Sequence, residues 1–277
     1  MVRTSPTFRR RRLARRIRYL RERAGLTQEH AACELDMSTS ALSRKENGDV
    51  ITSVHEARSM MDLYDIRDPE LLDLARAARE RGWWRAYGVE DRGYVDLETE
   101  ACFVRDFQVT TVPGLLQTED YARALFQSGR IGASPEQIRN DLAVRMIRRQ
   151  RLTDVENPLE LRAVVDEAAL WRTVGERRVM YEQVVHLAEC AEMPTVELQV
   201  LPLGSGAHCA MNGAFTLLEF AEPADPEVLY VEYPTGSLHV EKASEVRAGR
   251  LLFEDLRSSA LDFQESVKLI KKVAEKL

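Results

Sequence analysis

The sequence lacks any apolar run of the roughly 18–20 residues that a helix needs to cross a bilayer, which excludes a membrane-spanning protein. Its four cysteines, Cys33, Cys102, Cys190 and Cys209, are widely scattered and form no Cys-x-x-Cys pair. That spacing excludes a zinc ribbon or a dense disulfide framework. It predicts a cytoplasmic protein, because isolated thiols fit a reducing compartment.

Acidic residues are scarce at the start of the chain. Residues 1–25 hold ten arginines and a single acid, Glu22, for a net charge of +9. Residues 1–80 carry +3 and the whole chain −6, so residues 81–277 carry −9. A basic end on an acidic chain predicts a polyanion contact confined to one part. An organelle transit peptide is the alternative, but the arginine run continues into a helix with core spacing, which favours the first interpretation.

The composition is that of an ordinary globular protein, with 44% hydrophobic and 30% charged residues. Its 277 residues allow one or two domains. Helical spacing and caps predict five short helices and an all-α domain over residues 1–80. From Gly82 onward the composition changes, because glycines and aromatic residues become frequent. We therefore place the boundary between residues 75 and 95 and expect a second domain over 83–277.

The second domain has a mixed pattern. Helical periodicity predicts helices over 97–108, 118–127, 135–152, 175–190 and 241 to the C-terminus. Strand-like runs lie at 159–165, 196–201, 214–220, 228–233 and 237–240. The last four are consecutive and separated by turn residues, which predicts an antiparallel meander with helices before and after it, an α+β fold.

The segment from Thr27 to Gly48 has the spacing of a helix-turn-helix. Thr27 is a natural N-cap for the first helix and Ser38 for the second. Asp36 lies in the turn between them and tolerates the left-handed conformation that a tight turn requires. This segment predicts that the second helix lies in the major groove of double-stranded DNA.

Residues 13–64 resemble the helix-turn-helix domain of phage-repressor-type regulators, the XRE family. The matching residues are Leu20-Arg21, Gly25-Leu26-Thr27-Gln28-Glu29, Ser38, Ser43-Arg44, Glu46 and Gly48. The resemblance implies that Gln28 holds a phosphate. It also implies an ion pair between Arg21 and Glu46 that ties the first helix to the third and is structural. A protein-interaction domain that does not bind DNA is the alternative for the whole module.

The predicted DNA contacts fall into two sets. A recognition helix presents its N-terminal and outward side chains to base edges, which here are Thr39, Ser40, Ser43 and Arg44. Arg44 is the best direct reader, because a guanidinium matches O6 and N7 of guanine. Contacts to phosphates, without regard to sequence, are expected from Lys45, Arg9, Arg10, Arg11 and Arg12. Lys45 stands where the family usually has an apolar residue, so we expect it to face the DNA backbone.

A second resemblance covers residues 83–274. They resemble the C-terminal domain of unknown function attached to many actinobacterial regulators of this type, related to the WhiJ-like group. The matching strings are Trp83-Trp84, Val112–Thr118 with Tyr121-Ala122, Asp166–Leu170, Gln199–Pro202 and Gly213–Phe220. The resemblance implies a transcriptional regulator and, for many members, a small companion protein encoded nearby that binds or antagonises it.

Catalysis has one candidate site, the loop 204–213 with adjacent His208 and Cys209. A Cys–His nucleophile needs the two groups brought together in space, which neighbours in one loop rarely achieve. The histidines and cysteines show no spacing typical of zinc ligands. We therefore expect no enzyme, no catalytic or metal-binding residues and no cofactor. A ligand or peptide site in this domain is a hypothesis from its architecture alone, and no effector-binding residue can be named.

The sequence thus predicts a sequence-specific transcriptional regulator whose second domain senses a partner protein or a ligand. A homodimer is expected, because one short recognition helix contacts few base pairs. The closing helices offer apolar residues either for a dimer interface or for covering their own sheet: Leu251, Leu252, Leu256, Leu261, Phe263, Val267, Ile270 and Val273. The alternative function is an antitoxin-like module that acts mainly by binding a companion protein.

Overall fold

The computed structural model describes residues 7–89, 93–129 and 132–277. The chain divides into two compact units, Met1–Gly82 and Trp83–Leu277. Each unit has a hydrophobic core of its own. Within the described ranges, no helix is both long and apolar enough to cross a membrane.

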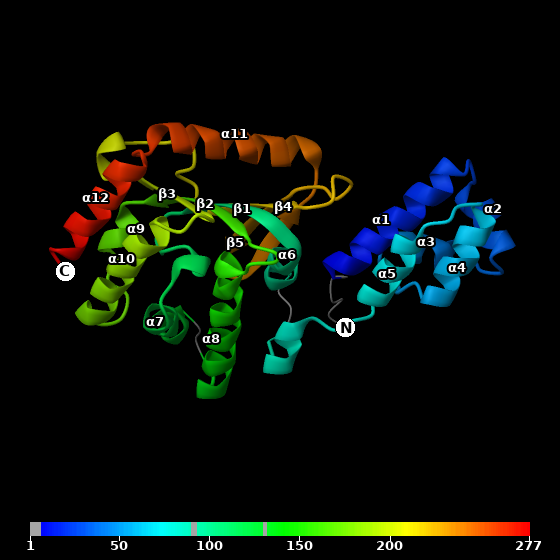
Figure 1. Ribbon diagram of the computed structural model, residues 1–277, viewed down its shortest axis with the longest axis horizontal. Coiled ribbons are helices and arrows are strands. Elements are labelled where there is room, and N and C mark those ends of the chain that lie inside the picture. Colours follow the sequence, from blue (N-terminus) through cyan, green and yellow to red (C-terminus); the bar gives the residue numbers. More distant parts are fainter. Residues whose placement is uncertain (1–6, 90–92, 130–131) are drawn as a thin grey trace. The chain divides into compact units, whose positions relative to one another are not determined.

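The regular structure of the first unit, over its described residues, is helical (Figure 1). Its helices are α1 (Phe8–Arg23), α2 (Gln28–Glu34), α3 (Thr39–Glu46), α4 (Val54–Leu63) and α5 (Pro69–Ala77). The predicted five-helix module is therefore confirmed. Four of the helices begin at a side chain that accepts a hydrogen bond from a backbone N–H of the first turn: Thr27, Ser38, Ser53 and Asp68.

Turns with positive φ bring these short helices around a common core. Gly25 ends α1 with φ +71°, and Asp36 takes φ +53° between α2 and α3, as its place in the turn predicts. The core consists of buried apolar side chains from all five helices and the residues that end α4 and α5: Leu13, Ile17, Leu20, Ala31, Ala32, Leu42, Ala57, Met60, Tyr64, Leu71, Ala75 and Ala78.

The second unit is an α+β domain built on a six-stranded mixed sheet. Its strands are β1 (Ala101–Gln108), β2 (Glu160–Asp166), β3 (Val196–Leu201), β4 (Phe215–Phe220), β5 (Val228–Tyr233) and β6 (Gly236–Val240). The strand order is β3-β2-β1-β4-β5-β6. The pairs β3–β2 and β2–β1 are parallel, and the other three pairs are antiparallel. The predicted fold class is thus confirmed.

Helices cover both faces of this sheet (Figure 1). On one face lies α11 (Ala243–Ser259), which contacts β3, β4 and β5. The opposite side carries α7 (Glu119–Gly129), α8 (Pro135–Gln150) and α10 (Arg177–Ala191), while α12 (Phe263–Ala274) packs on α10 and β3. Shorter helical elements are η1 (Trp83–Tyr87), α6 (Tyr94–Glu100), η2 (Gly114–Leu116), η3 (Arg151–Thr153), α9 (Ala168–Trp171) and η4 (Leu203–Ser205).

The predicted four-strand meander is wrong in one strand. The segment 196–201 lies at the far edge of the sheet and pairs in parallel with β2, to which α10 connects it. Only β4, β5 and β6 form consecutive antiparallel neighbours. The loop between β3 and β4 must pass β2 and β1, a distance of about 14 Å at normal strand spacing. Its Gly-rich sequence looks like a hairpin turn, and sequence alone does not show that it crosses the sheet.

The predicted helix over 97–108 is also wrong from Ala101 onward. Helix α6 ends at Glu100 and the chain continues as β1, the strand paired with both β2 and β4. A central strand buried on both faces does not alternate between apolar and polar residues. Its short apolar run is therefore hard to distinguish from a helix by periodicity alone.

Candidate nucleic-acid interface

The outward face of α3 carries a stripe of small polar residues and one cation. Thr39, Ser40, Arg44 and Asn47 are exposed and Ser43 is half-buried, at spacings that place them on one side of the helix. The helix has eight residues, which gives it a length of about 12 Å. The major groove of DNA is about 12 Å wide, so the whole stripe fits into one groove.

Arg44 is free for a partner outside the chain. Within the described ranges, its guanidinium makes no hydrogen bond or ion pair. The hydroxyl of Ser40 lies 3.1 Å from that of Ser38, which itself accepts a hydrogen bond from the backbone N–H of Ala41. The first turn of α3 is therefore held by its own serines, and the guanidinium one turn later remains available.

The inward face of α3 is held by a buried ion pair. Arg21 on α1 donates from Nε to Oε1 of Glu46 at 2.6 Å and from Nη2 to Oε2 at 2.9 Å. Its Nη1 donates to the carbonyl of Leu26 at 2.8 Å. These hydrogen bonds with Glu46 raise the pKa of Arg21 above its ordinary value. The structure thus brings together Arg21 and Glu46, the two residues for which the family resemblance implies an ion pair.

Gln28 joins the same cluster. It opens α2, is half-buried, and donates from Nε2 to Oε2 of Glu46 at 3.0 Å. Its amide is therefore partly engaged inside the unit, and a phosphate contact would have to use the remaining amide atoms. The phosphate-holding role stays a prediction.

The expectation that Lys45 faces the DNA backbone does not agree with its surroundings. Lys45 is only 8% exposed. Its Nζ lies 2.9 Å from Oε1 of Glu56 and donates to the carbonyl of Ile51 at 3.2 Å. The position follows Arg44 by one residue, which turns it toward the inward side of α3. Its aliphatic stem is buried there, where the family usually has an apolar residue, and the ammonium pairs with α4.

The arginine-rich start of α1 lies beside the turn that follows α3. A Cβ added at Gly48 would lie 3.5 Å from the Cα of Arg11, so this turn packs against the α1 backbone. All four arginines, Arg9, Arg10, Arg11 and Arg12, are half-buried. Arg9 donates to Glu80 at 2.8 Å, which reduces its availability for a phosphate.

The loop 204–213 does not assemble a Cys–His pair. Nε2 of His208 lies 3.7 Å from Oδ2 of Asp166, whereas Sγ of Cys209 points to the carbonyl of Leu252 at 3.5 Å. Burial and the neighbouring Asp255 raise the pKa of the Cys209 thiol to about 11, so it stays protonated at neutral pH. Across the described ranges, no three His, Cys, Asp or Glu side chains gather in a group that could hold a metal ion.

Comparisons with known families agree with this division of the chain. Residues 12–75 match the model of a helix-turn-helix domain, and residues 91–272 match the model of a domain of unknown function, DUF5753. The second match spans more than half of the chain. The chain belongs to the DUF5753 family. In this DUF5753 protein, the match to a helix-turn-helix domain supports a DNA-binding regulator. No curated protein matches the chain.

The DUF5753 domain contains a cavity that sequence analysis did not predict. Its lining includes Asp106 on β1 and Arg145 on α8, neither of which belongs to a recognisable motif. The one available signal was a charged pair, Arg105-Asp106, inside the otherwise apolar segment that forms β1. Because that segment was predicted as a helix, the signal could not be placed on a buried strand.

Proposed function

We propose that this DUF5753 protein is a sequence-specific transcriptional regulator that reads double-stranded DNA with α3. The observation that carries the proposal is the division of α3 into two faces. Arg44 is exposed and unpaired within the described residues, while Glu46 two positions later is buried against Arg21. A rigidly held helix that offers a guanidinium fork to solvent is suited to read guanine in the major groove.

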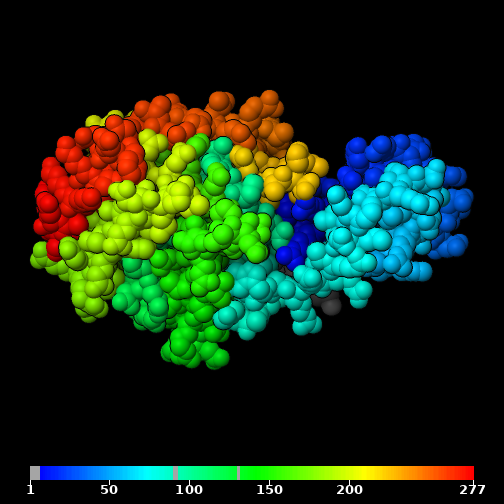
Figure 2. Space-filling view, in the orientation of Figure 1, coloured from blue at the N-terminus to red at the C-terminus, as the bar shows by residue number. Residues whose placement is uncertain are grey.

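We further propose that the protein binds DNA as a homodimer. The apolar residues of α11 and α12 fall into a buried set and an exposed set. Leu256, Val267, Ile270 and Val273 are buried in the second unit itself. Both α11 and α12 lie at the surface of the second unit in the space-filling view (Figure 2). Their exposed large apolar side chains are Leu251 (68% exposed), Leu252 (38%) and Phe263 (44%). These three residues are the candidates for a dimer contact.

The regulatory role of the second unit is also part of the proposal. A domain that adds a six-stranded sheet and a cavity to a DNA reader is suited to sense an effector. Across the described residues, no three His, Cys, Asp or Glu side chains gather in a group that could hold a metal ion. The thiol of Cys190 lies 3.2 Å from Nε2 of His186, but burial raises its pKa to about 11, so it stays protonated at neutral pH. We therefore propose that the protein acts by binding and in the cytoplasm. A companion protein remains a second candidate effector.

The test starts with genome-wide mapping of bound DNA and footprinting of the sites found. Arg44→Ala is then expected to change sequence preference at one base position, at a cost of about 1–3 kcal/mol for the preferred base. Arg10→Ala is expected to weaken all sites alike and to lower the salt dependence of binding. Arg76→Ala on α5, where the side chain pairs with Asp73, is the matched control and leaves both properties unchanged.

Two results would contradict the proposal. Equal binding to duplexes of every sequence would remove the reading role of α3. Weak binding that Arg44→Ala does not alter would instead favour the antitoxin-like alternative, in which a companion protein is the main ligand.

A further inference from the structure

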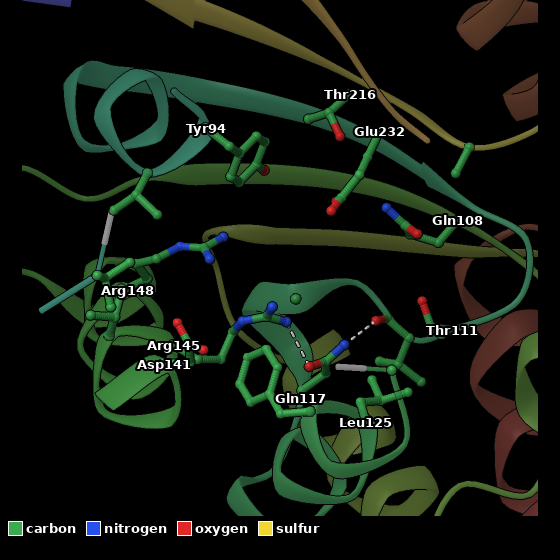
Figure 3. Close-up of a pocket in the computed structure, with 18 of the residues that line it drawn as sticks. Tyr94, Gln108, Thr111, Gln117, Leu125, Asp141, Arg145, Arg148, Thr216 and Glu232 are labelled. Atoms are coloured by element: carbon green, nitrogen blue, oxygen red, sulfur yellow. Dashed lines mark hydrogen bonds between the residues drawn. The ribbon is translucent and has the colours of Figure 1, made fainter. Parts of the chain in front are cut away.

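The second unit contains a cavity of about 790 Å³, partly open to solvent, between the sheet and the helices on one of its faces (Figure 3). The sheet side is lined by residues of β1, β4 and β5, including Asp106, Thr216 and Glu232. The helical side is lined by η2, α7 and α8, including Gln117, Leu125 and Arg145. Ligand pockets for drug-sized molecules range over roughly 300–1,000 Å³, so this cavity has the volume of a binding site.

Arg145 supplies a cation that makes no ion pair with a carboxylate among the described residues. Its Nη1 donates to Oε1 of Gln117 at 2.7 Å, and its guanidinium lies 5.1 Å from the ring centroid of Phe126. Its Nε is buried without a hydrogen-bond partner, and among the described residues it makes no ion pair. Burial and the nearby Arg148 lower the pKa of Arg145 to about 10, so it remains charged at neutral pH. Arg145 as a whole is half-buried, and a guanidinium withdrawn from water in this way is stabilised when an anion joins it.

The neighbouring Arg148 is already paired. It donates two hydrogen bonds to the carboxylate of Glu98, at 2.6 Å each, and its guanidinium lies 5.1 Å from the ring centroid of Tyr94. Such a two-point pair engages one edge of the guanidinium and neutralises its charge. Among the described residues that line the cavity, Arg145 is therefore the cation available to a ligand.

The segment Val112–Thr118, one of the matching strings in the sequence, contacts Arg145 and holds its side chain in place. Gln117 accepts from Arg145 and donates from Nε2 to the carbonyl of Val112 at 2.7 Å, which fixes its amide. Gly114 leaves the room that the guanidinium occupies, since a Cβ there would lie 2.8 Å from Nη1 of Arg145. The segment thus orients one charged group toward the cavity, as Figure 3 shows.

The opposite wall offers acceptors. Oδ1 of Asp106 accepts hydrogen bonds from Oγ1 of Thr216 at 3.0 Å and from Nε2 of Gln108 at 2.8 Å. Within the described residues, its second oxygen, Oδ2, accepts none, although Asp106 is only 5% exposed and lines the cavity. Glu232 on β5 turns its carboxylate toward the same space and makes no ion pair among the described side chains (Figure 3). This wall is suited to a protonated amine.

We propose that the cavity binds a small zwitterion, an amino acid or a short peptide, with its carboxylate on Arg145 and its ammonium against Asp106 and Glu232. Arg145 on one wall and Asp106 and Glu232 on the facing wall have charges opposite in sign to those of the carboxylate and the ammonium. The lining also includes Asp141 and Arg148, of which Arg148 is paired with Glu98. The proposal specifies the effector-sensing part of the proposed function. It rests on that function only where it implies that the ligand changes DNA binding. Binding itself depends on neither α3 nor an operator.

The test is calorimetric titration of the full-length protein with a panel of free amino acids and of unmodified tripeptides, which distinguishes the two sources of the same chemistry. Each compound that binds is compared with its N-acetylated form, which lacks the ammonium, and with its C-terminal amide, which lacks the carboxylate. Each modification is expected to weaken binding at least tenfold.

Variants assign the two charges to the two walls. Arg145→Met is expected to remove the preference for the free carboxylate over the amide, and Asp106→Asn to reduce the preference for the free amine over the acetylated form. Arg139→Met, an exposed position on α8 outside the cavity lining, is the matched control and binds like the parent protein. Gly114→Ala, which displaces the guanidinium by one methyl group, is expected to weaken binding without removing a charge. Thermal unfolding of each variant checks that the second unit is intact.

Three outcomes would overturn the inference: no member of the panel binds, binding is equal in Arg145→Met and the parent, or the acetylated form binds as well as the free amine. The last result would reduce the site to an anion site. DNA binding is measured separately, with and without the compound. A protein that binds the zwitterion but shows no sequence-specific DNA binding would contradict the proposed function and leave the cavity assignment standing.

Discussion

The guanidinium of Arg21 and the carboxylate of Glu46 meet in a two-point ion pair, with side chains only 9% and 2% exposed. The pair joins α1 to the last residue of α3, two positions after the outward-facing Arg44. Gln28 from α2 donates to the same carboxylate, so three helices converge on Glu46. The orientation of the candidate recognition helix therefore depends on a residue that does not itself face DNA.

Glu46→Ala is expected to destabilise the first unit by about 3–5 kcal/mol, because Arg21 would remain buried without a counter-charge. Unfolding in guanidinium chloride measures this, with circular dichroism following both units. All three tryptophans, Trp83, Trp84 and Trp171, lie in the second unit, so their fluorescence reports that unit alone. Asp73→Ala, which removes an exposed partner of Arg76 on α5, is the control and should change little. Equal effects of the two variants would show that burial of the pair is unimportant.

Lys45→Met separates a structural lysine from a DNA-binding one. The aliphatic stem is kept while the ion pair with Glu56 is lost, so we expect lower stability of the first unit. The slope of log affinity against log salt should stay unchanged, because a buried ammonium releases no counterion from DNA. Arg10→Ala provides the comparison and should reduce that slope by about 1. A similar reduction for Lys45→Met would return this residue to the set of phosphate contacts.

Leu251→Asp tests the proposed dimer. This side chain is the most exposed of the large apolar residues on α11, and a charge there should oppose burial between two copies. Sedimentation velocity is expected to show a dimer for the parent protein and a monomer for the variant. The control is Leu238→Asp on β6, where a leucine is 54% exposed but belongs to another element. An unchanged mass for Leu251→Asp would remove α11 from the interface.

Asp106 makes stability depend on pH in a direction opposite to that of most carboxylates. Burial raises the pKa of Asp106 from 3.8 to about 6, and hydrogen bonds from Gln108 and Thr216 only partly oppose this. Because the folded state holds the proton more tightly than the unfolded state between pH 4 and pH 6, the free energy of unfolding falls as pH rises through that window. The shift corresponds to roughly 2–3 kcal/mol of lost stability above pH 6.

Asp106→Asn removes this titration. Relative to the parent, the variant is expected to gain stability between pH 4 and pH 7, by an amount of that order, in urea unfolding followed by tryptophan fluorescence. Asp154→Asn should behave in the reverse manner. Backbone N–H groups of Asn157 and Glu156 lower the pKa of Asp154, so its contribution is present at pH 7 and is lost as pH falls. A flat difference for Asp106→Asn across the range would show that the carboxyl is not raised.

The sequence was most informative where structure is set by neighbours along the chain. Thr27 and Ser38 mark the starts of α2 and α3 by capping hydrogen bonds to residues three positions later, and Asp36 marks the turn by its tolerance of positive φ. Such signals need only a few consecutive residues. The helix-turn-helix and the outward position of Arg44 could therefore be predicted without coordinates.

It was least informative where partners come from distant segments. The strand β1 carries Val104 and Phe107, fully buried between β2 and β4, and its pattern resembled a helix because both faces are covered. The place of β3 at the far edge depends on its pairing with β2, which no local pattern states. Lys45 shows the same effect on one side chain, since its partner Glu56 lies on another helix.

By itself, then, the sequence determined the helices of the first unit, their caps and turns, and the face of α3 that looks outward. Only the tertiary structure decided that Lys45 is buried, that the sheet is mixed, and that Arg145 and Asp106 face one cavity from opposite walls. The physical reason is that caps and turns are stabilised by hydrogen bonds between near neighbours. Strand order, buried ion pairs and cavities depend on contacts between residues far apart in the chain.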